Sequence, residues 1–221
     1  MNSEQTDRER RAARYAALAD PARLHIVDLL ASADLSPQEL LARLGMTSNL
    51  LSHHLKVLEK AGIVVRTRSE GDRRRTYVTL LSEPDGAEPH GSPLTASRIV
   101  FVCTANSARS QLAEHLWRTR SDVPVASAGT VPATAVAPGA AAVAADHGMD
   151  LSGATPKLLS DIHHDGDVLI SVCDSAHELL THTDLHWSIP DPVAAGTPDA
   201  FEQTYQHLTR RIDGLLPHLA A

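Results

Sequence analysis

The chain has 221 residues, a hydrophobic fraction of 43% and a formal net charge of −7, which is enough apolar material for one large domain or two small ones. Aromatic residues make up only 3%, so Leu, Val, Ile and Ala must fill the core. No apolar run approaches the roughly 18 residues of a membrane span, two cysteines exclude a disulfide framework, and residues 1–15 lack an apolar signal region, so we expect a cytoplasmic protein.

The charge is unevenly distributed along the chain. Residues 1–82 hold 13 Lys/Arg against 10 Asp/Glu, a net +3, whereas residues 83–221 hold 7 against 17, a net −10. Residues 82–97 carry three prolines and two glycines without apolar periodicity, which is the composition of a linker. We therefore predict two domains with different partners, over residues 1–82 and 98–221, joined by a linker over residues 83–97.

Two helices are indicated at the start of the first domain. Residues 8–19 are rich in Ala and Arg, which have high helix propensity. Asp20 followed by Pro21 is the pattern of an N-cap and a first helical turn. An apolar face that begins at Leu24 continues this second helix to about Ala31.

The next two helices are separated by a short turn. Ser36 and Glu39 predict a capping box for a third helix, which stops at Gly45. Thr47 or Ser48 then caps a fourth helix, SNLLSHHLKVLEKAG, and the short connection is typical of a helix-turn-helix. His54 fits either a core or a surface position. The residues of this helix that we expect in the core are Leu50, Leu51, Leu55 and Leu58.

A basic hairpin follows the fourth helix. Two strand-like runs, residues 63–68 and 75–81, flank a Gly-Asp turn. An arginine-rich hairpin is by itself more often a solvated surface. Beside a helix-turn-helix it forms a wing that can reach phosphates and the minor groove. The arginines concerned are Arg66, Arg68, Arg73, Arg74 and Arg75.

This order of helices, turn and basic hairpin, over roughly residues 10–81, resembles the winged-helix repressors of the ArsR family. The segment LSHHLKVLEKAGIV is its most specific part. The resemblance implies a homodimer that places a recognition helix, Ser48 to Lys60, in the major groove of double-stranded operator DNA. Metal-sensing relatives bind soft metals through cysteines, but this domain has none, which excludes a soft-metal thiolate site. The residues expected to meet bases and phosphates are Ser48, Asn49, Ser52, His53 and Lys56.

The second domain opens with an apolar strand, 98-RIVFVC-103, that ends in a cysteine. A loop over residues 103–110 leads into a helix over residues 110–120, whose positive end stabilises a thiolate. Arg109 adds a bidentate donor for an oxyanion, Ser110 can bond the thiolate or cap the helix, and Asn106 can tie the loop through its amide. A lone cysteine here would be a buried strand residue, but this spacing predicts a nucleophile. Backbone N–H groups of such a loop form a nest for a tetrahedral oxyanion, and its members are Thr104, Ala105, Asn106, Ser107, Ala108, Arg109 and Ser110.

Strands alternate with helices through the rest of the domain. We expect a strand at residues 123–130, a strand that enters a helix at residues 165–180, and a strand followed by a loop at residues 185–196. A helix is expected within residues 137–153, where it stops at Gly148, and another over residues 199–219. The alternation predicts an α/β fold with a parallel sheet of about four strands. Such sheets bind ligands at the carboxyl ends of their strands, where Cys103, Cys173 and Asp191 all fall.

The segments VFVCTANSARSQLAEHL, SAGT, VLISVCDSAHE and HWSIPDP resemble the low-molecular-weight tyrosine phosphatase fold over about residues 98–219, and more narrowly its arsenate reductase branch. The resemblance implies that Cys103 attacks the arsenic of bound arsenate and that Arg109 holds the oxyanion. Asp191 is then the general acid, and Cys173 the second redox cysteine. Phosphatases of this fold usually place aromatic residues after the Asp-Pro pair, whereas residues 193–196 are VAAG, which favours arsenate over phosphotyrosine.

Two departures leave the source of electrons open. Ala108 stands where many relatives have a cysteine, and the third cysteine expected near Leu180 is missing. Either an external small-molecule thiol attacks the arsenate adduct, or a redoxin reduces a Cys103–Cys173 disulfide, or turnover does not occur. We expect no bound cofactor and no metal, because the 13 histidines show no reliable metal-ligand spacing. The alternatives are a regulator whose second domain is a non-catalytic sensor of arsenate, phosphate or arsenite, and a protein-tyrosine phosphatase.

Overall fold

The fold is that of a computed structural model, which describes residues 3–81 and 94–219. The chain divides into two compact units, one made of Met1–Arg68 and Arg73–Gly91 and the other of Ser69–Asp72 and Ser92–Ala221. Most of the predicted linker, residues 83–93, lies outside the described residues.

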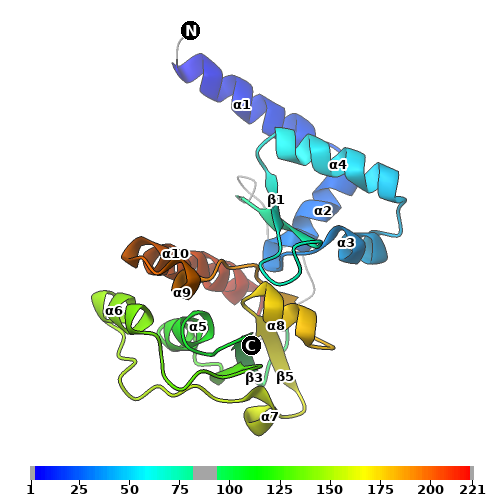
Figure 1. The fold of residues 1–221 in the computed structure, drawn as a ribbon. Coiled ribbons are helices and arrows are strands. Elements are labelled where there is room, and N and C mark those ends of the chain that lie inside the picture. The colour runs from blue at the N-terminus through cyan, green and yellow to red at the C-terminus, as the bar shows by residue number, and fades with distance from the viewer. Residues whose placement is uncertain (1–2, 82–93, 220–221) are drawn as a thin grey trace. The chain divides into compact units, whose positions relative to one another are not determined.

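The first unit begins with helices (Figure 1), and the caps of the second and third are those that the sequence predicts. Asp20 caps the second helix through its side chain, Ser36 and Glu39 form a capping box at the third, and Gly45 ends that helix in the left-handed conformation at φ 62°. The helix-turn-helix is therefore defined by local signals. The four helices are α1 (Ser3–Leu18), α2 (Pro21–Ser32), α3 (Pro37–Leu44) and α4 (Ser48–Lys60).

The apolar face of α4 is narrower than the sequence analysis predicts. Leu51, Leu55 and Leu58 are buried, as is His54, whereas Leu50 is 46% exposed. The prediction that Leu50 lies in the core is wrong. The buried positions follow an i, i+3, i+4, i+7 stripe that starts at Leu51, and Leu50 lies one residue, about 100°, outside that stripe.

The hairpin pairs β1 (Val64–Arg68) with β2 (Thr76–Leu80) in an antiparallel register that sets Arg68 opposite Thr76. Leu35 adds a bridge to Val78, with backbone hydrogen bonds of 2.8 and 3.2 Å in the two directions. This bridge ties the connection between α2 and α3 to the hairpin. The first unit is therefore a winged helix-turn-helix, as predicted.

The second unit contains the predicted parallel sheet of four strands. β3 (Arg98–Cys103) pairs with β4 (Val125–Gly129) on one side and with β5 (Asp167–Ser171) on the other, and β6 (Leu185–His186) completes the order β4-β3-β5-β6. Because the chain passes from β3 to β4 and then crosses back to β5, the carboxyl end of β3 is a topological switch point. Cys103 stands at that point.

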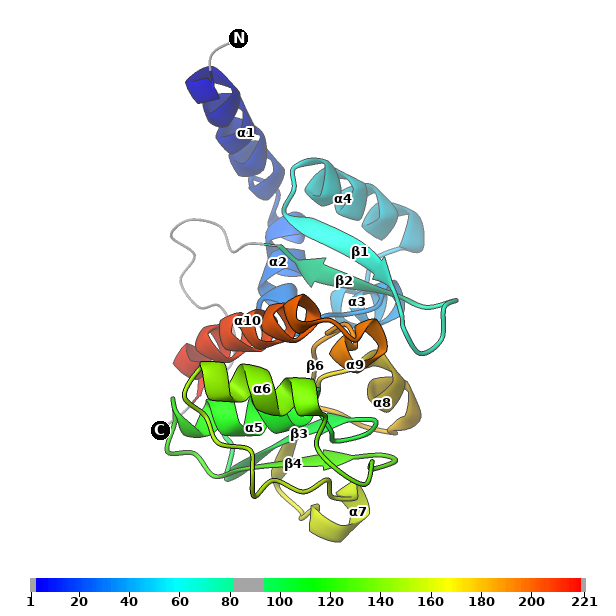
Figure 2. The ribbon, with the colours of Figure 1, turned by 60° about the vertical axis from the view of Figure 1, so that its left-hand side comes forward.

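Helices cover both faces of this sheet (Figure 2). α5 packs on β3 and β4, with α6 and α10 beyond it, and α8 contacts β3 and β5. The ring of Phe101 packs between those of Trp117 and Trp187, at centroid distances of 5.9 and 5.7 Å, all in the core. The helices are α5 (Arg109–Arg118), α6 (Pro138–Asp146), α7 (Leu159–Ile162), α8 (Asp174–Leu179), α9 (Pro192–Ala195) and α10 (Pro198–Leu215), followed by the 3₁₀ turn η1 (Leu216–His218).

The segment over residues 185–196 differs from its prediction. Its strand, β6, has two residues, and the expected loop contains the short helix α9. Asp191 is the N-cap of α9 and accepts the N–H of Val193 at 3.1 Å, with Pro192 in the first turn. The cap pattern is present in the sequence, but a helix of four residues has no apolar periodicity by which it could be recognised.

Breaking the Arg98–Asp167 ion pair is expected to destabilise the protein chiefly above pH 4. Arg98 donates to both oxygens of Asp167, at 2.8 and 2.6 Å, and is the largest cause, followed by the N–H of His164, that lowers the pKa of Asp167 from 3.8 to about 2. The pKa of Asp167 is lower in the folded than in the unfolded chain. The contribution of the ion pair to the free energy of unfolding is therefore complete above the unfolded pKa and is lost as the pH falls toward 2. We expect Arg98→Gln to lower the free energy of urea unfolding by about 2 kcal/mol at pH 7 and by about half as much at pH 3.

The control for this prediction is Arg120→Gln. Arg120 pairs with Asp213, whose side chain is exposed, so its removal should change the free energy of unfolding by less than about 1 kcal/mol at either pH. An equal loss in Arg98→Gln at both pH values would mean that the ion pair is not the cause.

Candidate active site and nucleic-acid interface

The sulfur of Cys103 is held from two sides in the core of the second unit. Cys103 is the last residue of β3 and is buried. Its Sγ lies 3.0 Å from the Ser110 hydroxyl in the first turn of α5 and accepts the backbone N–H of Asn106 at 3.1 Å. The loop between strand and helix therefore bends back around the sulfur.

Asn106 fixes the shape of that loop. It is fully buried and adopts φ 48°, which is uncommon for a residue other than glycine. Its Nδ2 donates to Ser110 Oγ (2.8 Å) and Ser127 Oγ (2.9 Å), and its Oδ1 accepts from Gln111 Nε2 (3.1 Å) and the N–H of Lys157 (2.8 Å). These four hydrogen bonds of the amide hold Asn106 in its left-handed conformation and tie the loop to α5, to β4 and to Lys157.

The far end of the loop holds Arg109 against the segment that carries Asp191. Arg109 is 8% exposed, its Nη1 donates to the backbone oxygen of Ile189 at 3.0 Å, and its Nη2 lies 3.3 Å from Asp191 Oδ2. The structure thus brings together the predicted oxyanion-binding cation and the predicted general acid. The side chain of Asp191 is one-third exposed, so a group bound at this end of the site can reach it from solvent.

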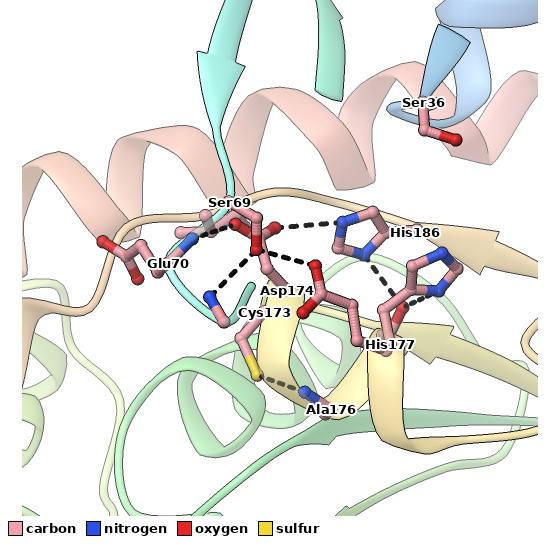
Figure 3. A network of polar contacts seen from close by, with 12 residues as sticks. Ser36, Ser69, Glu70, Cys173, Asp174, Ala176, His177 and His186 are labelled. Carbon is pink, nitrogen blue, oxygen red and sulfur yellow. Dashed lines mark hydrogen bonds and ion pairs between the residues drawn. The ribbon is translucent and has the colours of Figure 1, made fainter. Parts of the chain in front are cut away.

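Cys173 lies beside the same loop. It is the N-cap of α8, its Sγ accepts the N–H of Ala176 at 3.4 Å (Figure 3), and it lies 3.5 Å from Thr104 Oγ1. Burial raises the pKa of the Cys173 thiol, and the positive charge of Arg109 opposes that rise. Both Cys103 and Cys173 are free thiols.

Several residues that support the site were not identified from the sequence. Gly129 ends β4 so close to the loop that a Cβ there would lie 2.6 Å from the backbone oxygen of Thr104. The buried carboxylate of Glu114 accepts the hydroxyl of Ser127 at 2.5 Å and lies 3.4 Å from Lys157 Nζ. These contacts join residues distant along the chain, so no local pattern reveals them.

The predicted DNA contacts that belong to α4 lie on one face of that helix. Positions i, i+1, i+4, i+5 and i+8 from Ser48 lie on the side opposite the buried stripe. Arg66, on β1, donates two hydrogen bonds to Glu59, at 2.7 and 2.6 Å, and these raise the pKa of Arg66. The exposed predicted contacts are Ser48, Asn49, His53, Lys56, Arg66, Arg68, Arg73, Arg74 and Arg75, and Ser52 is half-buried.

Two further features are absent from residues 3–81 and 94–219. Within these ranges no helix combines the length and the apolar character needed to cross a membrane. Their His, Cys, Asp and Glu side chains form no group of three or more that could hold a metal ion.

Comparisons with known proteins divide the chain in the same way. Residues 98–221 match the family described as low molecular weight phosphotyrosine protein phosphatase, and residues 20–65 match the bacterial regulatory proteins of the arsR family. An arsenate reductase of Brevibacillus brevis is 32% identical over 123 residues, which span 52% of this chain and 90% of that protein. An arsenate reductase of Bacillus subtilis is 31% identical over 132 residues, which span 55% and 94%.

A solved structure agrees at the level of the fold. The low molecular weight protein tyrosine phosphatase from T. tengcongensis is 23% identical, with a TM-score of 0.50, over 56% of this chain and 100% of that one.

Proposed function

Because the chain belongs to the low molecular weight phosphotyrosine protein phosphatase family over residues 98–221 and carries an ArsR-family helix-turn-helix at residues 20–65, we propose that it is a transcriptional regulator fused to an arsenate reductase. The observation that carries the proposal is the buried Cys173 thiol, 3.5 Å from Thr104 Oγ1 of the nucleophile loop. Phosphoester hydrolysis needs a nucleophile, a cation and an acid. Reduction needs a further thiol as well.

In the first step the Cys103 thiolate attacks the arsenic of bound arsenate. The S–As bond forms as one As–O bond breaks, and a proton from Asp191 lets the leaving hydroxyl depart as water. The backbone N–H groups of the loop and the guanidinium of Arg109 hold the remaining oxygens. Asp191 lies 3.3 Å from Arg109, so the acid and the oxyanion-binding cation act on the same group.

In the second step a thiol attacks Cys103 Sγ. An S–S bond forms, the S–As bond breaks, and its electron pair stays with arsenic, so As(V) becomes As(III) and leaves as arsenite. Two thiols are oxidised to one disulfide, and the attacking thiol gives its proton to the departing oxyanion. Cys173 is the attacking thiol that the chain itself offers, and an external redoxin then reduces the Cys103–Cys173 disulfide. A small-molecule thiol can take the same role from solution.

A direct assay tests this proposal. The full-length protein is incubated with arsenate and either a small thiol or a reduced redoxin, and arsenite and oxidised thiol are measured. We expect one disulfide to form for each arsenite that is released, and we expect only weak hydrolysis of an aryl phosphate. Strong aryl phosphate hydrolysis without arsenite would instead identify a tyrosine phosphatase.

A second candidate function is a sensor. It is favoured by the absence of cysteine from residues 1–82, which places any thiol-based sensing in the second unit. This candidate predicts no arsenite with either reductant, together with release of DNA on addition of arsenate, phosphate or arsenite. Release by arsenite, which bonds to sulfur, should be lost in Cys103→Ser.

We propose that the first unit binds operator DNA as a homodimer, with two recognition helices about one turn of DNA apart. Arg73→Ala combined with Arg75→Ala should weaken binding about tenfold and reduce the slope of log K against log[salt] by about 0.9 for each phosphate that the protein no longer neutralises. Fluorescence anisotropy over a salt series measures both quantities. Arg120→Ala is the control, because Arg120 pairs with Asp213 in the second unit and is not a predicted DNA contact, and it should leave both quantities unchanged. An unchanged slope in the double variant would mean that the hairpin does not bind phosphates.

A further inference from the structure

A second buried polar cluster lies next to Cys173, at the carboxyl ends of β5 and β6 (Figure 3). Ser171, Asp174 and His186 are each at most 3% exposed. Ser171 Oγ lies 3.0 Å from His186 Nδ1, and His186 Nε2 lies 3.1 Å from Asp174 Oδ1. The ring of His177 stacks on that of His186, with 4.1 Å between the ring centroids. His177 Nδ1 lies 2.8 Å from Thr183 Oγ1. Polar groups are costly in a core unless such bonds satisfy them.

The carboxylate of Asp174 is the charged member of this cluster. Burial raises its pKa, but bonds from His186, the Glu70 backbone and Ser188 outweigh burial and leave the pKa below its ordinary value. Asp174 is therefore ionised near neutral pH, so its Oδ1 accepts a hydrogen bond from His186 Nε2–H. Its other oxygen accepts the N–H of Glu70, a residue of the same compact unit, at 2.8 Å.

This carboxylate belongs to the residue that follows Cys173. Helix α8 has only six residues, and so short a helix is not stable without outside contacts. The bond from β6 through His186 to Asp174 fixes the first turn of α8. The same turn determines where Cys173 Sγ points, because Sγ accepts the N–H of Ala176 within it.

We propose that His186 and Asp174 are positioning residues for Cys173, holding its sulfur toward the nucleophile loop for attack on Cys103. The inference rests on the proposed reductase activity. Displacement at sulfur requires the attacking sulfur, Cys103 Sγ and arsenic to lie nearly in line, and a shift of about 1 Å can cost 10²-fold in rate. Cys173 is 1% exposed. An external thiol therefore cannot reach Cys103 through the position that the Cys173 sulfur occupies if that sulfur points elsewhere in the core.

The test variant is His186→Gln, with Asp174→Asn as a second variant that keeps the size of the side chain. With arsenate and a redoxin, kcat should fall about tenfold while KM for arsenate stays unchanged, because the residue orients a thiol and does not bind the oxyanion. His182→Gln is the matched control, since His182 is exposed and bonds to Asp184 close by in the chain. It should leave both constants unchanged.

A second readout does not depend on reductase activity. Alkylation of each cysteine by iodoacetamide, followed by mass spectrometry, should be about tenfold faster at Cys173 in His186→Gln and nearly unchanged at Cys103, because only the first turn of α8 opens more often. General destabilisation would instead raise both rates together and would overturn the proposal, as would an unchanged rate at Cys173. If the wild type makes no arsenite, the proposed function fails, and the ratio of the two alkylation rates alone decides this inference.

Discussion

Cys103→Ser is expected to abolish arsenite formation, with kcat lowered at least about 10³-fold, because an alcohol is a weak nucleophile and cannot be oxidised to a disulfide. Binding of the oxyanion should survive, since the loop is held by Asn106 and by contacts of Arg109 that do not involve the sulfur. We expect phosphate to bind the variant within about threefold of its wild-type affinity, as backbone donors and Arg109 remain. Coupled arsenite assays and titration calorimetry with phosphate measure the two quantities.

The companion variant Cys173→Ser separates the two sources of electrons. If Cys173 supplies the second sulfur, turnover with a redoxin is lost while turnover with a small-molecule thiol persists, because that thiol can attack Cys103 directly.

Arsenite formation by Cys103→Ser at the wild-type rate would show that arsenic is attacked by another group. Loss of phosphate binding in Cys103→Ser would show that the sulfur itself is needed to hold the loop.

The parts of this fold that the sequence predicts are those fixed by neighbours in the chain. Asp20, Ser36 and Gly45 define helix ends through bonds that span at most four residues. The strand, loop and helix around Cys103 lie within residues 98–118, so a local pattern is enough to predict that Cys103 ends a strand and that a helix follows it. The four parallel strands follow in the same way from alternating local patterns.

The remainder depends on contacts that only the folded chain creates. Asn106 was assigned a tying role, but two of its partners, Ser127 and Lys157, lie 21 and 51 residues away. Likewise, nothing near His186 in the sequence indicates that it bonds to Asp174. The error at Leu50 has another cause, because a run of two leucines does not specify which one begins the buried stripe.

Arg109→Lys is expected to affect binding and catalysis together, in contrast to Cys103→Ser. The guanidinium of Arg109 is planar, and its two terminal nitrogens are oriented by the backbone oxygen of Ile189 and by Asp191. A lysine keeps the charge but offers donors from one nitrogen, so it cannot hold an oxyanion through two parallel bonds while keeping those contacts. We expect kcat/KM for arsenate to fall about 10²–10³-fold, with a parallel rise in the inhibition constant of phosphate. Arg120→Lys, whose side chain pairs with Asp213, should leave both constants unchanged. If Arg109→Lys reduced arsenate at the wild-type rate, a positive charge alone would suffice, and bidentate hydrogen bonding to the oxyanion would have no part in the reaction.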